Sequence, residues 1–207
     1  MNKQSGVTLV ELLVALSAAG IFSLGLFGFL FVHRTHLAAE ELRISLREDA
    51  RLALDFIVRE LRQAGARPVD GACSGFQRLT VADAQRVVMQ YDFRGDRAGR
   101  PPDGCPDDPS ERVVYQYDPD RQAILRATGL RGRPQPFITN VPPDGFVLRY
   151  YDRVRNELIP SLDAAGRARV HAVELTVQTS HPHPDQSVTQ PISLQLRAMV
   201  HLPNPPS

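Results

Sequence analysis

The chain has 207 residues, a formal net charge of +1 at pH 7 and 43% hydrophobic residues, which suits one domain plus a further segment. The small net charge gives no argument for nucleic acid or for a strongly acidic partner. Apolar residues are concentrated near the N-terminus, whereas all 17 Pro and most of the 14 Gly lie after residue 64. The sequence therefore predicts a helical first part, and a second part rich in turns and short strands.

The first element is a long apolar segment. No charged residue interrupts Leu12 to Val32, and a helix of this length spans about 32 Å, enough to cross the hydrocarbon core of a bilayer. A secretory signal has a shorter apolar core followed by a small-residue cleavage site. Here His33 and Arg34 follow instead, so we expect the segment to remain in the mature protein.

Two residues at the start of this segment are candidates for function. Glu11 lies at the N-terminal edge of this segment. A carboxylate costs about 2.5–3.5 kcal/mol at mid-membrane depth and less near the interface, and an ionisable residue in such a segment indicates a function. An ordinary membrane anchor with a Glu at headgroup level is the alternative. Upstream is a short polar leader that ends at Gly6. The run reads Gly6-Val7-Thr8-Leu9-Val10-Glu11-Leu12-Leu13-Val14.

This run resembles the prepilin cleavage motif of type IV pilins and type II secretion pseudopilins. The resemblance implies that a prepilin peptidase cuts after Gly6 and methylates the new N-terminal amine on Val7. The glutamate that these proteins carry near the start of the mature chain falls on Glu11. Val7 departs from the family pattern, which usually has Phe at this position, and the departure bears on methylation more than on cleavage.

Glu11 has a physical role once the chain begins at Val7. The new amine is a positive charge at the membrane edge, and staggered packing of similar helices brings it towards Glu11 of a neighbouring chain. In a low dielectric this attraction is much stronger than in water and offsets the cost of burying each charge. We therefore expect Glu11 to set the register of assembly.

The helix is predicted to continue past the membrane, over about residues 7–64. Gly65 and Pro68 supply the stop signal, and a helix of that length measures roughly 87 Å. Its second half is amphipathic, with charged residues such as Arg51 and Asp55 on one face. The apolar face is Leu42, Leu46, Ala50, Ala53, Ile57, Leu61 and Ala64, which repeats at helical spacing and is predicted to be core.

Short β-like runs separated by turn residues follow. The candidates are Phe76–Val81, Arg86–Phe93, Arg112–Asp118, Ala123–Thr128, Phe146–Asp152, Ala168–Ser180 and Ser187–Leu202. Tyr117-Asp118-Pro119-Asp120 has the composition of a type I turn that joins two of them. Strands after one long helix indicate an α+β fold, a long N-terminal α-helix packed on an antiparallel β-sheet globular domain.

The expected organisation has four parts: a cleaved leader (1–6), the transmembrane half of the helix (7–33), its amphipathic half (34–65) and a β-rich periplasmic domain (66–207). Lys3 precedes the span while Arg34, Arg43 and Arg47 follow it, so the distribution of positive charge does not place the domain outside. The periplasmic location is therefore implied by the resemblance alone.

The two cysteines, Cys73 and Cys105, lie in loops rich in Gly and Pro. Neither belongs to a C-x-x-C pair, so a zinc site would need ligands that the sequence does not cluster. For an exported domain a disulfide is favoured. Closing the loop between the two cysteines would stabilise the folded protein by roughly 3–4 kcal/mol in the chain-entropy model. Two unrelated buried thiols are the alternative.

We find no catalytic motif of the H-E-x-x-H, G-x-S-x-G or P-loop type, and we expect no enzyme, cofactor or metal. His181 and His183 are interpreted as a solvated loop. A cluster of arginines, Arg121, Arg126, Arg131 and Arg133, is interpreted as a solvated face rather than a nucleic-acid site, since no aromatic residues are interleaved. An acidic loop with the oxygen ligands that calcium prefers misses the EF-hand pattern and is expected to be a polar surface. Its carboxylates are Asp92, Asp96, Asp103, Asp107 and Asp108.

Segments 50–65, 92–96, 113–117 and 147–152 are similar to W-type minor pilins. Major pilins commonly have a cysteine pair near the C-terminus. This sequence has no cysteine there, and the difference favours a minor subunit. The implied function is filament initiation or capping, with other minor and major pilins, prepilin peptidase, the inner-membrane assembly platform and membrane lipid as partners. A J-like pseudopilin of type II secretion is one alternative, and a membrane-anchored periplasmic enzyme or binding protein is another.

Overall fold

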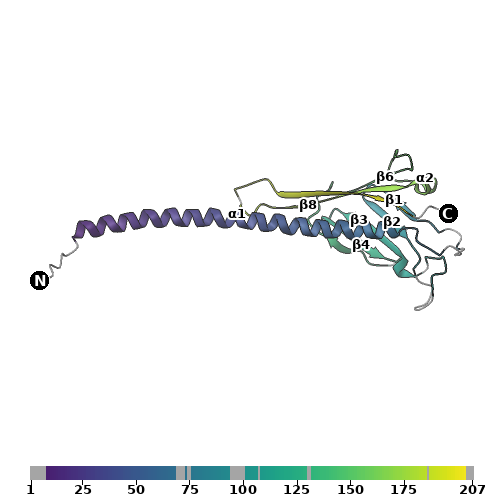
Figure 1. The fold of residues 1–207 in the computed structure, drawn as a ribbon, viewed down its shortest axis with the longest axis horizontal. Coiled ribbons are helices and arrows are strands. Elements are labelled where there is room, and N and C mark those ends of the chain that lie inside the picture. Colours follow the sequence, from purple (N-terminus) through teal and green to yellow (C-terminus); the bar gives the residue numbers. More distant parts are fainter. Residues whose placement is uncertain are drawn as a thin grey trace.

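The computed structural model describes residues 8–68, 73, 76–93, 101–106, 108–129, 132–185 and 187–203. A long helix forms a rod, and a β-rich domain surrounds its C-terminal half (Figure 1). The predicted α+β class is confirmed, although the strands form two antiparallel sheets.

Helix α1 runs without a break over Leu9–Gln63, 55 residues, which corresponds to about 82 Å. Thr8 is its N-cap. At the other end Gly65 takes a φ of 84°, a left-handed conformation that glycine adopts without steric cost. The Gly65 N–H donates to the carbonyl of Gln90 at 2.8 Å, so the end of the helix is fastened to the first sheet.

The other elements form two sheets of strand order β1-β2-β3-β4-β5 and β7-β6-β8-β9, with all described pairs antiparallel. Their bounds are β1 (Leu79–Ala82), β2 (Arg86–Gln90), the 3-10 helix η1 (Pro109–Glu111), β3 (Arg112–Asp118), β4 (Ala123–Thr128), β5 (Gln135–Ile138), β6 (Phe146–Tyr151), β7 (Glu157–Leu158), α2 (Ala164–Arg169), β8 (Ala172–His181) and β9 (Ile192–His201).

Strands β3 and β4 have the predicted bounds, and the hairpin between them is confirmed. Its turn lies later than predicted, at residues 119–122, because Asp118 still pairs with Ala123. The Asp118 carboxylate accepts the N–H groups of Asp120 and Arg121 at 3.0 and 3.2 Å. This side-chain bonding to the nearby backbone fixes the turn two residues further along the chain than predicted.

Several strand predictions need correction. The first two candidates are longer than β1 and β2, which cover only Leu79–Ala82 and Arg86–Gln90. The candidate Ala168–Ser180 begins inside α2, because Asp163 caps that helix by accepting the Gly166 N–H at 2.7 Å. The last candidate starts too early, since β9 begins only at Ile192, directly after Pro191. The sequence also missed β5 and the two-residue β7, which are short edge strands with weak alternation.

One core joins the helix to both sheets. Of the predicted apolar face, Ala50, Ile57 and Leu61 are fully buried, and Leu42 is only partly covered. Helix α1 packs on β8 and β9 of the second sheet and on β5 of the first. The two sheets contribute the largest buried side chains, among them Tyr115, Phe146 and Tyr150. The amphipathic half of α1 is therefore the central element of the domain.

Candidate functional site: the N-terminal helix

Glu11 closes a capping box with Thr8 at the start of α1. The carboxylate of Glu11 accepts the backbone N–H and the hydroxyl of Thr8, each at 2.9 Å, and the Thr8 hydroxyl accepts the Glu11 N–H at 3.3 Å. These bonds satisfy donors that a helix start leaves free. A carboxylate has about four acceptor positions, so Glu11 keeps capacity for a further donor.

Gly6 and Val7, the predicted cleavage and methylation residues, lie outside the described residues. Their roles remain predictions. Helix α1 begins at Leu9, with Thr8 as its N-cap and Glu11 in its first turn.

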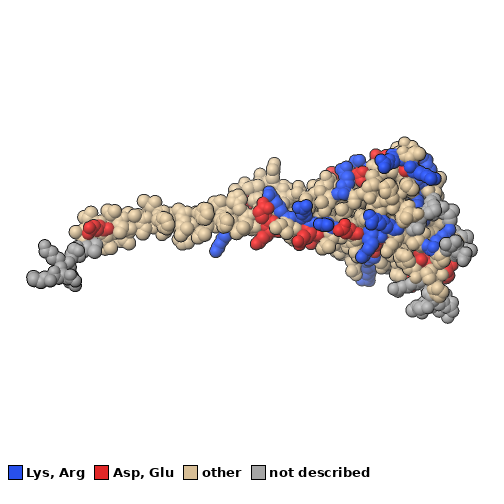
Figure 2. Space-filling model, in the orientation of Figure 1, with Lys and Arg blue, Asp and Glu red and all other residues tan. Residues whose placement is uncertain are grey.

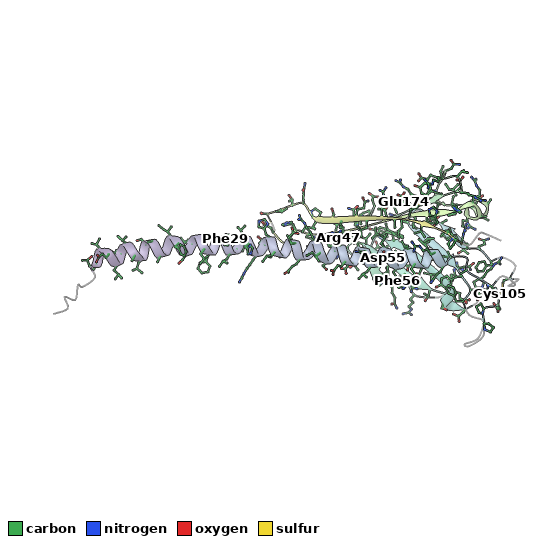
Figure 3. The ribbon with its side chains drawn as sticks, viewed as in Figure 1. Phe29, Arg47, Asp55, Phe56, Cys105 and Glu174 are labelled. Carbon is green, nitrogen blue, oxygen red and sulfur yellow. A yellow bond between two sulfur atoms is a disulfide. The ribbon has the colours of Figure 1, made fainter. Side chains whose placement is uncertain are left out.

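The first half of α1 is a stem of exposed apolar side chains, with Leu9, Phe22, Phe27 and Phe31 each more than 70% exposed. Figure 2 shows a stretch without charge along this stem, and Figure 3 places Phe29 on the part of the helix that extends beyond the domain. By length and composition, α1 is the one helix in the described part of the chain that could cross a membrane, and its most apolar stretch is not buried in the domain. So large an exposed apolar surface requires lipid or other apolar helices around it.

The second half of α1 is held in the domain by a charged contact. Glu60, buried on α1, accepts from the guanidinium of Arg126 on β4 at 2.6 Å and from the hydroxyl of Tyr115 on β3 at 2.5 Å. Burial and the carboxylate of Glu60 raise the pKa of the Tyr115 phenol, so the phenol stays protonated as a donor. The guanidinium of Arg126 also lies over the ring of Phe56.

Sequence reasoning missed this contact and was wrong to interpret Arg126 as part of a solvated face. The side chain of Arg126 is only 28% exposed. The signals were present, since Glu60 lies at helical spacing from Ile57 and Ala64. Arg126 lies two residues after the fully buried Ile124, and so on the same face of β4. What was missing was the pairing of two residues 66 positions apart.

The predicted disulfide between Cys73 and Cys105 is present, with Cα atoms 5.1 Å apart and a sequence separation of 32. It joins the segment after α1 to the segment before η1. This link lies at the end of the domain opposite the stem, where Figure 3 labels Cys105.

The prediction that the acidic loop is a polar surface is wrong for Asp92. Asp92 is buried and accepts the Gly104 N–H, while Asp108 caps η1. Asp96 and Asp107 lie outside the described residues.

In the loop that contains the histidine pair, His183 accepts the Asp185 N–H at 3.0 Å. Across the described part of the chain, no three His, Cys, Asp or Glu residues lie close enough to hold a metal ion.

Comparison with known proteins supports the interpretation of the N-terminus. The family model of the prokaryotic N-terminal methylation motif matches residues 1–27. By this motif the chain is type IV pilin-like. The pilin-like motif covers Gly6, Val7 and Glu11 together with the exposed apolar stem as far as Phe27.

Among solved structures, the chain is similar to a type IV-like pilin from Thermus thermophilus. The two are 16% identical, with a TM-score of 0.42, over 77% of this chain and 97% of that one. No curated protein sequence matches this pilin-like chain.

Proposed function

We propose that this protein is a minor pilin, anchored in the inner membrane by its stem and incorporated by that stem into a type IV filament. The observation that carries the proposal is the continuity of α1, since one helix joins the methylation motif, an exposed apolar stem and the centre of a folded domain. A flexible tether would leave an anchored domain free to turn. A rigid rod instead fixes the domain relative to the packed helices.

Glu11 is the proposed register residue. Cleavage after Gly6 would create an ammonium group at Val7, and packing of staggered stems would bring that group to a neighbour's Glu11. The capping box pre-orients the carboxylate at the helix start and leaves acceptor capacity for the incoming ammonium. In an apolar environment the pairing strengthens as water is excluded.

The proposed organisation follows the sequence prediction. Residues 1–6 form the cleaved leader, 7–33 the membrane half of the helix, 34–65 its amphipathic half and 66–207 the periplasmic domain. The disulfide is consistent with an oxidising compartment. Other minor and major pilins, prepilin peptidase and the inner-membrane assembly platform are the proposed partners. The W-type minor pilins are the proposed branch of the family.

Processing is tested by the intact mass of the protein purified from its native membranes. The proposal expects a chain that begins at Val7, carries one methyl group and retains the oxidised cysteine pair. A native chain that still begins at Met1 would refute the proposal.

Assembly is tested by substitution of Glu11. In Glu11→Gln the amide can still cap the helix, but the negative charge is lost, so we expect membrane insertion to be normal and filament formation to fall strongly. Glu48→Ala is the matched control, because Glu48 is an exposed glutamate on the same helix. Normal filaments from Glu11→Gln would contradict the register role. If Glu11→Gln instead abolishes type II secretion and leaves the pili intact, the chain belongs with the J-like pseudopilins.

A further inference from the structure

A pocket lies on the outer face of the second sheet, at the end of β6. Its floor is Ala172 of β8, which pairs with Tyr151 of β6 on one side and with His201 of β9 on the other. Directly opposite residues in antiparallel strands point to the same face, so a single methyl group lies between two ring side chains. Met199 and His171 complete the walls of a cavity of about 580 Å³. This volume suits a small organic ligand.

The rim of the pocket is cationic. Arg153 and Arg155 line it from the turn that follows β6. Asp152 organises this turn by accepting the N–H groups of Val154 at 3.0 Å and Asn156 at 2.8 Å. Burial raises the pKa of Asp152, but these hydrogen bonds and the neighbouring arginine outweigh it and lower the pKa overall. The Asp152 carboxylate is therefore ionised, and its hydrogen bonds hold the turn that carries Arg153 and Arg155.

The charges around the pocket do not balance. The nearby carboxylates already have arginine partners, in the pairs Arg169–Asp152 at 3.5 Å, Arg149–Glu157 at 3.8 Å and Arg197–Glu174 at 3.3 Å. Within the described residues, neither Arg153 nor Arg155 forms an ion pair, and both are exposed. Figure 2 shows basic side chains interspersed with acidic ones over this end of the domain. Two guanidinium groups thus remain unmatched beside a pocket.

The backbone at Arg155 supports a role for its side chain. Arg155 has a φ of 67°, a left-handed conformation that costs a non-glycine residue roughly 1–2 kcal/mol. Glycine or asparagine would take this position more readily. A long cationic side chain is therefore held at the rim despite a backbone cost, and strain of this kind is often associated with ligand sites.

We propose that this pocket binds an organic anion, a phosphate or carboxylate group on a small apolar or planar body. Arg153 and Arg155 would hold the anionic group, because guanidinium forks match both phosphate and carboxylate. Tyr151 and Met199 would contact the body. The imidazole rings of His171 and His201, with centroids 5.8 Å apart, would donate further hydrogen bonds to the anionic group. A metal cation is disfavoured by the unmatched guanidinium groups, and the proposal does not depend on filament assembly.

The methionines provide a direct measurement. In the full-length chain in detergent micelles, labelled with 13C at the methionine methyl groups, Met199 reports on the pocket. Met89 is the internal control, because it is fully buried in the first sheet. Titration with phenyl phosphate is expected to shift the Met199 signal saturably and to leave the Met89 signal in place.

Two variants separate binding from folding. Arg153→Gln combined with Arg155→Gly should raise the dissociation constant at least tenfold. Its melting temperature should be unchanged or higher, because glycine relieves the left-handed backbone. Ala172→Leu fills the pocket without a change of charge and should abolish the shift. Arg47→Gln combined with Arg133→Gln removes two exposed arginines elsewhere and should change the dissociation constant less than twofold.

The anion could be a free molecule or an acidic side chain of a docked protein. Benzoate and phenyl phosphate represent the first source, and a short amidated peptide with Glu between two Phe residues represents the second. The tighter binder identifies the source. Absence of a saturable Met199 shift with all three probes would overturn the proposal, as would equal affinity in the control and the Arg153/Arg155 variant.

Discussion

At the scale of single residues, Glu60 is the side chain on which the seating of α1 depends most. It brings a negative charge into the core, and Arg126 and Tyr115 compensate that charge. Removal of one member of a buried pair leaves the other without compensation, which is costlier than removal of both. The pair therefore favours one register of the helix on the first sheet, since a slide of α1 would separate the partners.

Arg126→Met should lower the free energy of unfolding by about 2–3 kcal/mol, somewhat less than for a fully buried pair because part of Arg126 reaches solvent. Urea unfolding of the full-length chain in detergent measures this. Arg51→Met is the control, since its contact with Asp55 is long, at 3.8 Å, and exposed, and it should cost less than about 0.5 kcal/mol. The double variant with Glu60→Met should recover much of the loss. A loss as large in the double variant would contradict the compensation argument.

At the scale of elements, α1 combines two environments in one helix. From Leu9 to Val32 its side chains face outwards all round, whereas Ala50, Ile57 and Leu61 are sealed in the domain. Alternation of strand residues was informative where strands were long or central, as in β3 and β4. It failed at β5 and β7, where the sheet edge supplies pairing but the sequence supplies little pattern.

Ile57→Ala should lower the free energy of unfolding by about 2–5 kcal/mol, because it removes fully buried methyl groups and leaves a cavity. Leu52→Ala on the same helix is the matched control. Leu52 is 69% exposed, so its truncation should have little effect on unfolding. Thermal unfolding followed by near-UV circular dichroism compares the two. Equal shifts would show that the amphipathic half of α1 is not seated as described.

At the scale of the whole molecule, the disulfide restrains the end of the domain farthest from the stem. Cys73 and Cys105 join two segments that secondary structure does not pair. Since the crosslink chiefly limits the unfolded chain, Cys73→Ser with Cys105→Ser should reduce stability by about 3–4 kcal/mol in the chain-entropy model. The measurement is denaturant unfolding of the oxidised protein and the double variant, with thiol titration as the check on oxidation state. An unchanged midpoint would show that the loop is ordered without the link.

The sequence by itself determined the continuous helix, the division of that helix into an apolar and an amphipathic half, and the residues that face the core. These follow from composition and from a period of 3.6, which are local properties of the chain. Only the tertiary structure decided that the strands form two sheets, that Glu60 meets Arg126, and that Ala172 lies between Tyr151 and His201. Each of these depends on which distant segments pair, and local periodicity carries no information about the partner.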